Sequence, residues 1–281
     1  MRLLFLAALF LPIAALAQTT VTTRPANTIV AAPVVPVTPA APPSPWKISY
    51  FVEWYGPALG NIDLRRTQVP GSPPYYSEID HSFKLGYGVS KDVTIGTQIR
   101  GTTLLAPDAG FIFFDPRLYT QWSNMINTSD VGMSGKVSFQ YPTSGYYRNQ
   151  GNFLSIKMDF NFELKTALRN WSFSFDAMVH PYFFNDPVSD GGKIDLEFGI
   201  FPYVTLDLSP NVQLLFEGSF DGNHNYNSAF YDFASAYSDY IDIGPLFTVN
   251  SHINTNVALR FFMDDISFKQ SAIYANIGVA L

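Results

Sequence analysis

The chain contains no cysteine. It therefore forms no disulfide bond, has no thiolate nucleophile and cannot hold a metal through sulfur ligands. Basic residues are outnumbered, because 17 Lys and Arg stand against 23 Asp and Glu, which gives a formal net charge of -6. This balance argues against a nucleic-acid-binding protein, which would carry a basic surface.

A long hydrophobic run is missing as well. Hydrophobic residues make up 47% of the chain, but no uncharged apolar run reaches the roughly 18–20 residues that a membrane-spanning helix requires. Aromatic residues are abundant, at 16%. That content is high for a soluble enzyme and is typical of the aromatic girdles of membrane barrels.

The stretch 77–104 shows the pattern that organises the chain. Apolar residues occupy every second position of 79–89, with His81 as the exception, and polar residues or glycines lie between them. A polar turn at 90–92 follows, and 93–99 then alternates in the same way. This period of two predicts two strands joined by a tight turn. Each strand has about 10–12 residues, twice the usual length in a soluble sheet, which favours a transmembrane β-barrel.

The same alternation recurs along the chain and predicts about 12 strands, with 10 to 14 as the range that single-sequence boundaries allow. The predicted strands are 46–54, 77–89, 93–104, 114–122, 131–141, 153–163, 171–183, 194–206, 212–220, 240–249, 253–262 and 271–281. Pro116 makes 114–122 the weakest of them. Long polar loops follow the odd-numbered strands, and shorter connections follow the even ones. We therefore expect an all-β, antiparallel, up-and-down barrel with both termini in the periplasm.

Two segments precede the expected barrel domain, which is 46–281. Residues 1–17 are expected to be a secretory signal peptide, because Arg2 precedes an apolar segment that ends in an Ala-Leu-Ala cleavage site near Ala17. A membrane anchor is the alternative, but the segment is short for one. Residues 18–45 are rich in Pro, Ala and Thr, and we expect a disordered periplasmic linker, since proline prevents a strand ladder. A role in binding peptidoglycan or a partner is the alternative for this linker.

The C-terminal residues resemble the β-signal of outer-membrane proteins, which pairs a polar residue, a glycine and apolar residues at fixed spacing. The matching positions are Asn276, Gly278, Val279 and Leu281. The signal usually ends in Phe, and Leu281 departs from that pattern. The resemblance implies insertion into the bacterial outer membrane by the barrel assembly machinery, in contact with lipid and lipopolysaccharide.

One hairpin suggests a family. The sequence GYGVSKDVTIG at 86–96 resembles a hairpin of the phenol-degradation meta-pathway family of outer-membrane barrels. The turn LSPNV at 208–212, followed by Glu217 and Gly218, is similar to a later strand-turn-strand of that family. The resemblance implies a channel or transporter for small solutes, among them hydrophobic or aromatic compounds. No substrate-binding residue carries over from it.

The polar face of the predicted strands should line a narrow lumen and carries charges of both signs. The candidate lumen residues are Lys84, Arg100, Arg117, Lys136, Lys157, Asp159, Asp176, His180, Asp195, Glu197, Glu217 and Arg260. A channel with weak cation preference is the favoured interpretation. A barrel filled by salt bridges is the alternative, and its long loops, 56–76 and 221–239, would then bind a partner. Inward glycines favour an open lumen because small residues leave room; they are Gly86, Gly88, Gly96, Gly132, Gly199 and Gly244.

An enzyme is the main rival class. Outer-membrane lipid-modifying enzymes use a His and a Ser on the membrane face, and residues two apart on a strand share a face. None of the four histidines has a Ser two positions away, although a pair assembled from different strands stays possible. His180 is expected in the lumen beside Asp176, as a proton switch or as a structural residue. His81 is expected at the outer membrane interface.

We expect no catalytic residue, cofactor or metal. The acidic loop 221–239 lacks the spacing of a calcium loop. The solute, the oligomeric state and the gating of such a channel are not specified by these patterns.

Overall fold

The computed structural model describes residues 44–59, 77–105, 110–143, 148, 151–165, 168, 170–185, 193–226, 229, 233–234, 239–263, 266–268 and 270–281. The expected signal peptide and nearly all of the expected linker lie outside these residues, as does most of the predicted loop 56–76. No helix among the described residues is long and apolar enough to cross a bilayer.

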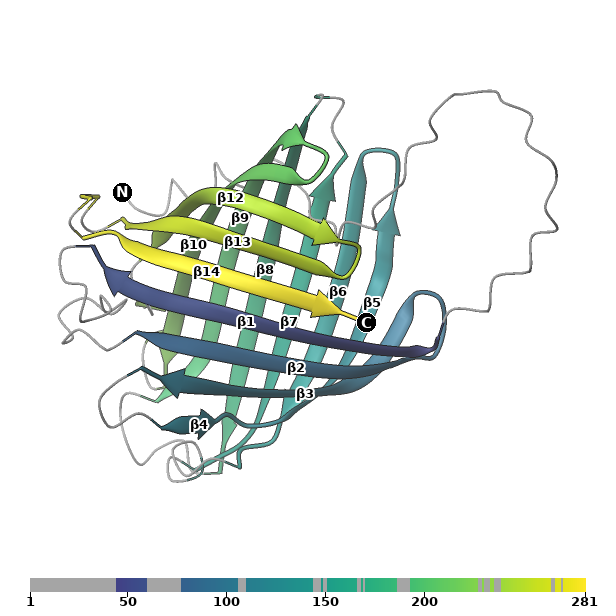
Figure 1. Cartoon of the computed structure of the whole chain (residues 1–281). Helices are drawn as coiled ribbons and strands as arrows, with labels where there is room; N and C mark the ends of the chain where they lie inside the picture. Colours follow the sequence, from purple (N-terminus) through teal and green to yellow (C-terminus); the bar gives the residue numbers. More distant parts are fainter. Residues whose placement is uncertain are drawn as a thin grey trace.

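The described residues form an all-β fold (Figure 1). Its strands are β1 (Trp46–Ala58), β2 (Glu78–Gly88), β3 (Val93–Leu104), β4 (Phe111–Phe113), β5 (Arg117–Asn127), β6 (Val131–Gln140), β7 (Asn152–Leu164), β8 (Trp171–Phe184), β9 (Ile194–Ser209), β10 (Val212–Asn225), β11 (Phe233–Ala234), β12 (Tyr240–Asn250), β13 (Ile253–Phe262) and β14 (Ala272–Ala280). All strands except the short β4 and β11 form one closed antiparallel barrel. The predicted barrel of 12 strands is therefore confirmed.

The barrel closes between its first and last strands. β1 pairs with β14 from Ser49↔Ala280 to Tyr55↔Tyr274, and β1 pairs along its other edge with β2. Each further barrel strand pairs with the next, as far as the β10–β12, β12–β13 and β13–β14 ladders. Because both edges of every long strand are paired, no long edge is left open to aggregation.

Short and long connections lie at opposite ends of the barrel. The turns β2–β3, β5–β6, β7–β8, β9–β10 and β12–β13 have six residues or fewer. The start of β1 and the C-terminal end of β14 lie at this short-turn end (Figure 1). The sequence anticipated this grouping of short turns, which single-chain barrels place on the periplasmic side.

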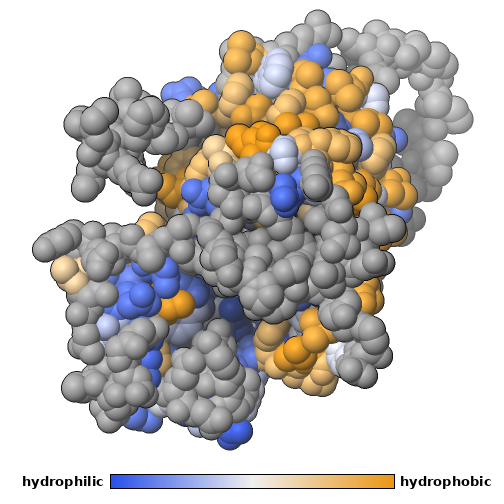
Figure 2. Space-filling view, turned by 90° about the vertical axis from the view of Figure 1, so that its left-hand side faces the viewer, coloured by the Kyte–Doolittle hydropathy of each residue, from blue (hydrophilic) through white to orange (hydrophobic). Residues whose placement is uncertain are grey.

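Side chains are distributed inside out relative to a soluble protein. Large apolar residues are exposed on one face of the strands, among them Phe83, Ile99, Leu118, Phe139 and Val257. The other face buries polar groups, including Gln98, Ser138, Asn256 and Arg260. An apolar outer surface and a polar interior are what a barrel in lipid requires. Hydrophobic side chains cover the flank of the molecule in Figure 2, and hydrophilic ones gather in a recess at the long-connection end.

The fourth barrel strand differs from the prediction. The predicted strand 114–122 begins only at Arg117, and the predicted loop before it contains β4, which pairs with β3 at Thr103↔Phe111. Pro116 cannot donate to a ladder, and Asp115 turns inward to accept hydrogen bonds from the Thr143 backbone N (2.6 Å) and Oγ1 (3.0 Å). These two residues separate β4 from β5.

The ninth barrel strand also runs further than predicted. β10 continues to Asn225 instead of ending at 220, and β11 pairs with it at His224↔Phe233. The polar sequence 221–225 carries no apolar alternation, because the apolar pattern marks only the part of a strand that faces lipid. The predicted loop 221–239 is therefore wrong over its first five residues and at β11.

Three of the six inward glycines lie against an aromatic side chain instead of leaving space. A Cβ at Gly86 would lie 2.8 Å from Tyr119 Oη, and one at Gly96 would lie 2.7 Å from the same ring. A Cβ at Gly199 would lie 2.7 Å from the ring of Phe201. The interpretation that glycines widen the lumen is therefore wrong at Gly86, Gly96 and Gly199, because each of these accommodates an aromatic ring beside the backbone.

Candidate functional site

The strand register places the candidate lumen residues on the buried, polar side of the barrel wall. Lys84 pairs with Gln98, Lys136 with Asp159, Glu217 with Asp242, and Asp242 with Arg260, all on one face. These positions alternate with the exposed apolar ones described above. The candidate site is therefore the polar interior of the barrel.

Five neighbouring strands each direct one cation inward. These cations, which we name the cationic wall, are Lys84 on β2, Arg100 on β3, Arg117 on β5, Lys136 on β6 and Lys157 on β7. Lys84 is close enough to the other side chains to feel the charges of Lys136, Lys157 and Arg100. The five side chains thus form one electrostatic cluster on one side of the lumen.

Asp159 is the acid that accompanies this cluster. Its carboxylate lies 2.9 Å from Lys136 Nζ and 3.1 Å from Lys157 Nζ. Arg117 donates through Nε to Gln140 Oε1 at 2.7 Å, and the Arg100 guanidinium lies 5.4 Å from the centre of the Phe114 ring. Lys84 has no hydrogen-bond or ion-pair partner within the described part of the chain. The Gln140 side chain that accepts from Arg117 also donates to Asp115 at 3.4 Å. Asp159 alone does not neutralise the three lysines of the wall, so a positive excess remains around Lys84.

Acids occupy the next three strands. We name Asp176 on β8, Asp195 and Glu197 on β9 and Glu217 on β10 the acidic wall. Asp176 accepts from Asn161 Nδ2 at 2.7 Å and from Tyr203 Oη at 3.3 Å. Asp195 lies 2.7 Å from His224 Nδ1. Glu217 has no hydrogen-bond or ion-pair partner among the described residues, and it feels the charges of Asp242, Arg260, Glu53 and Asp176.

Arg260 is the centre of a third cluster, near the seam of the barrel. It donates from Nε and Nη2 to the two carboxylate oxygens of Asp242, at 2.8 and 2.6 Å. Its guanidinium lies 3.6 Å from the centre of the Tyr240 ring and 4.5 Å from that of Tyr274. Tyr274 in turn donates to Glu53 at 2.7 Å. This cluster is self-contained and fills space on the side of β1, β12, β13 and β14.

His180 is not bonded to Asp176, its expected neighbour. Its Nδ1 lies 3.2 Å from Glu197 Oε2, and its Nε2 lies 3.0 Å from Ser155 Oγ. Tyr182 Oη donates to the same Glu197 oxygen at 2.8 Å. A Ser–His–Glu row is thus assembled from three adjacent strands, an arrangement that a search two residues along one strand could not find.

His81 interrupts the apolar pattern of β2. Its side chain lies on the outer face of the barrel, opposite to the lumen. It pairs with Val52 and Gly101, and its ring nitrogens lie 2.7 Å from Tyr50 Oη and 2.9 Å from Thr103 Oγ1. These partners satisfy the polar imidazole on the outer face, where lipid could not.

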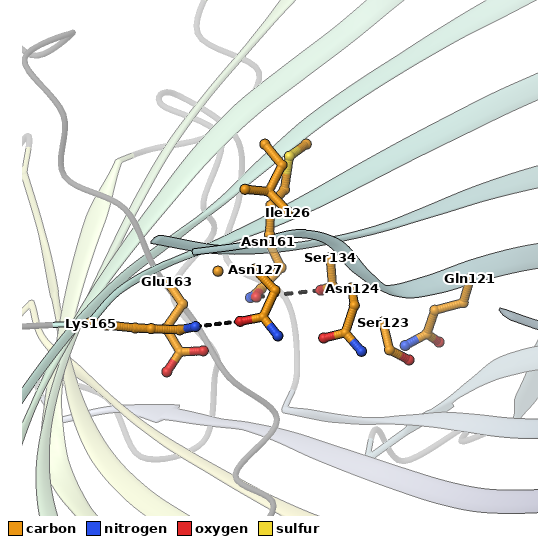
Figure 3. Close-up of a pocket in the computed structure, with 11 residues that line it drawn as sticks. Gln121, Ser123, Asn124, Ile126, Asn127, Ser134, Asn161, Glu163 and Lys165 are labelled. Atoms are coloured by element: carbon orange, nitrogen blue, oxygen red, sulfur yellow. Dashed lines mark hydrogen bonds between the residues drawn. The ribbon is translucent and has the colours of Figure 1, made fainter. Parts of the chain in front are cut away.

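A cavity of about 200 Å³ opens into the short-turn end of the interior. Polar side chains from β5, β6 and β7 line it, including Gln121, Asn127, Asn161 and Glu163 (Figure 3). Lys165 Nζ donates to Asn127 Oδ1 at 2.5 Å, and Ser134 Oγ donates to Asn161 Oδ1 at 3.5 Å, as the dashed lines show. The lining offers amide, hydroxyl, carboxylate and ammonium groups to a polar solute.

Sequence reasoning missed three aromatic members of the interior. The alternation correctly places Tyr119 and Tyr203 on the inward face, but Tyr55, Tyr240 and Tyr274, which surround Arg260, were not recognised there. The signal was present, because Tyr240 and Tyr274 are an even number of residues from Asp242 and Asn276 and so share their faces.

Comparisons with known proteins bear on the fold. No model of a known protein family matches the sequence, and no curated protein matches it significantly. The resemblance to the phenol-degradation family therefore stays a prediction.

An outer-membrane channel from Pseudomonas putida F1 has a TM-score of 0.55, with 12% identity, over 88% of this chain and 99% of that chain. The NanC porin has a TM-score of 0.46 and 7% identity, over 84% and 98%. The KdgM porin has a TM-score of 0.44 and 8% identity, over 83% and 98%. At 12% identity the likeness to the Pseudomonas putida channel establishes the fold alone, and the chain has the fold of an outer-membrane β-barrel.

Proposed function

We propose that the protein is an outer-membrane channel that lets small solutes diffuse through a narrow polar lumen. The observation that carries the proposal is the inverted distribution of side chains, apolar outside and charged inside, around a closed 12-stranded wall. A structural barrel needs no unpartnered charges in its interior, because buried charge without a partner is costly. Lys84 and Glu217 are charges of that kind among the described residues, and water in a pore would solvate them.

The lumen favours polar solutes. Its described lining is mainly charged, amide and hydroxyl groups. Most of its inward tyrosines are engaged by other residues: three surround Arg260, Tyr119 packs on Gly86 and Gly96, and Tyr203 donates to Asp176. Hydrophobic or aromatic solutes, which the family resemblance implies, would find few free apolar contacts there. We therefore place small polar molecules first among the solutes and keep aromatic compounds as the second class to be tested.

The same proposal fixes a cellular setting. The chain is secreted with cleavage near Ala17, inserted into the outer membrane with the help of its C-terminal strand, and oriented with both ends of the barrel domain in the periplasm. The short-turn end then faces the periplasm. Proteolysis of intact and permeabilised cells, with an epitope tag in the connection 263–271, tests this orientation.

The experiment for the channel is single-channel conductance of the refolded barrel in a planar bilayer. We expect steady current that falls sharply in Lys84→Trp, whose indole would enter the lumen. Lys91→Trp is the matched control, because Lys91 lies in the turn between β2 and β3 with its side chain in solvent. A folded barrel without current would contradict the channel and would support the alternative, a closed barrel whose long loops bind a partner.

The row formed by Ser155, His180 and Glu197 favours a hydrolase as a second candidate. Its distances suit nucleophilic catalysis, but Ser155 is only 1% exposed. The backbone N–H groups of these strands are also committed to sheet ladders, so they cannot serve as an oxyanion hole. Hydrolysis of a short-chain nitrophenyl ester, abolished in Ser155→Ala without loss of conductance, would support this second function.

A further inference from the structure

Charges of opposite sign are separated across the lumen instead of being interleaved. The cationic wall comes from the consecutive barrel strands β2, β3, β5, β6 and β7, and the acidic wall comes from the next three, β8, β9 and β10. The two walls adjoin between β7 and β8, and their far ends lie across the lumen from each other. Lys84 on β2 and Glu217 on β10 are five strand steps apart through β1 and seven through β5, so of 12 barrel strands they are nearly opposite.

The exceptions to this separation are locally compensated or lie toward the rims. Asp159 is bonded to two lysines of the cationic wall. Asp80 is hydrogen-bonded to Thr102 near the long-connection end of β2, and Glu78 begins the same strand. Asp115, just before β5, accepts hydrogen bonds from Gln140 and Thr143 at that same end. Glu163 lies near the short-turn end of β7. Arg260, on the acidic half, is neutralised by Asp242. None of these groups cancels the charge difference between the two walls.

Opposed walls of charge create an electric field perpendicular to the barrel axis. In a narrow lumen with low-dielectric walls such a field is focused and is stronger than in bulk water. A solute with one charge is attracted to one wall and repelled by the other. A solute that carries an anionic and a cationic group can contact both walls at once and gains from both.

We propose that the lumen selects small amphoteric molecules, with a carboxylate directed to the cationic wall and an ammonium group directed to the acidic wall. This inference rests on the proposed channel function and names its preferred solute class. Lys84 and Glu217 are its central contacts, because each presents an unpartnered charge among the described residues from one of the two walls.

Liposome swelling tests the proposal by comparing the entry rates of two small probes. Neither probe carries net charge, so no membrane potential develops as it enters. The probes are 5-aminopentanoate, which is amphoteric, and 5-hydroxypentanamide, which has the same number of heavy atoms and no charge. For the unaltered protein we expect the amphoteric probe to enter several-fold faster, as field-assisted entry predicts. Lys84→Met and Glu217→Gln should each lower the ratio of the two rates toward one.

Two turn variants are the matched controls. Lys91→Met and Asp130→Asn remove charges of the same signs from the short turns, outside the lumen, and should leave the ratio unchanged. Equal rates for both probes in the unaltered protein would overturn the amphoteric preference while leaving the channel intact. If neither probe enters liposomes that contain folded barrel, the channel function itself fails and the inference fails with it. A ratio above one that neither wall variant lowers would also overturn it.

Discussion

Arg260 and Asp242 face each other across the β12–β13 ladder and are joined by two hydrogen bonds of 2.8 and 2.6 Å. Both side chains are almost fully buried. Removing one partner leaves the other as an uncompensated buried charge, which costs about 3–5 kcal/mol. We expect Asp242→Leu to lower the denaturation temperature of the refolded barrel substantially, as measured by its shift in gel mobility on heating.

The double variant Asp242→Leu with Arg260→Met separates charge from packing. Replacing both members of a buried pair with apolar residues is often neutral, so the double variant should recover much of the lost stability. A double variant no more stable than Asp242→Leu would show that packing against Tyr240 and Tyr274, rather than charge pairing, is the main contribution of Arg260.

The lipid-facing surface can be tested at Leu118, which is 67% exposed on the outer face of β5. An Arg at the bilayer midplane on this face costs about 2–4 kcal/mol. We expect Leu118→Arg to lower the folding efficiency in lipid vesicles much more than in detergent micelles. Gln121→Arg on the inward face of the same strand is the control. Equal folding of both variants in vesicles would contradict the assignment of the outer face.

Gly244 allows close approach of two backbones. A Cβ at this position would lie 2.0 Å from the Val257 carbonyl oxygen, and a backbone atom cannot rotate away as a side chain can. Gly244→Ala should therefore reduce the yield of folded barrel in refolding trials. Gly110→Ala, where a Cβ would meet no atom within 4 Å, should fold like the unaltered protein. Comparable yields would mean that the β12–β13 ladder adjusts at low cost.

Ion selectivity reports on the acidic wall. Glu217→Gln removes an inward negative charge, so the cation preference expected for the lumen should weaken. The measurement is the reversal potential under a salt gradient, and Lys84→Met should shift it in the opposite direction. Asp130→Asn, in a turn, should leave the potential where it is. Shifts of the same sign for both lumen variants would exclude a direct electrostatic origin.

The sequence was sufficient for the strand number because lipid imposes a period of two on every spanning segment. The prediction for β13 matches at both ends, since the inward polar residues Asn254, Asn256 and Arg260 in Ile253–Phe262 are separated by even numbers of residues. It was insufficient where local chemistry overrides the period, as at Asp115 and Pro116, and where a strand leaves the apolar zone, as in 221–225.

The interior was predictable residue by residue but not contact by contact. Alternation places His180, Glu197 and Ser155 on inward positions, but which of them touch depends on the stagger between strands. That stagger is a property of the closed barrel and not of any single strand. The separation of charges does not depend on the stagger. In an up-and-down barrel the strands follow chain order around the wall, so the change from inward cations to inward acids is already present in the order of the sequence.

Closure of β1 on β14 has a consequence for how the chain reaches its native state. The hydrogen bond between Tyr274 and Glu53 joins residues 221 positions apart. Contacts of such long range slow folding, because the chain loses the entropy of loop closure before it gains free energy from the contacts. Until the nine residues of β14 are in place, β1 and β13 each keep an unpaired edge, and such edges template aggregation. A chain truncated before Ala272 should therefore aggregate on refolding where the full chain closes, so the last strand to be synthesised is the one that removes both open edges of the sheet.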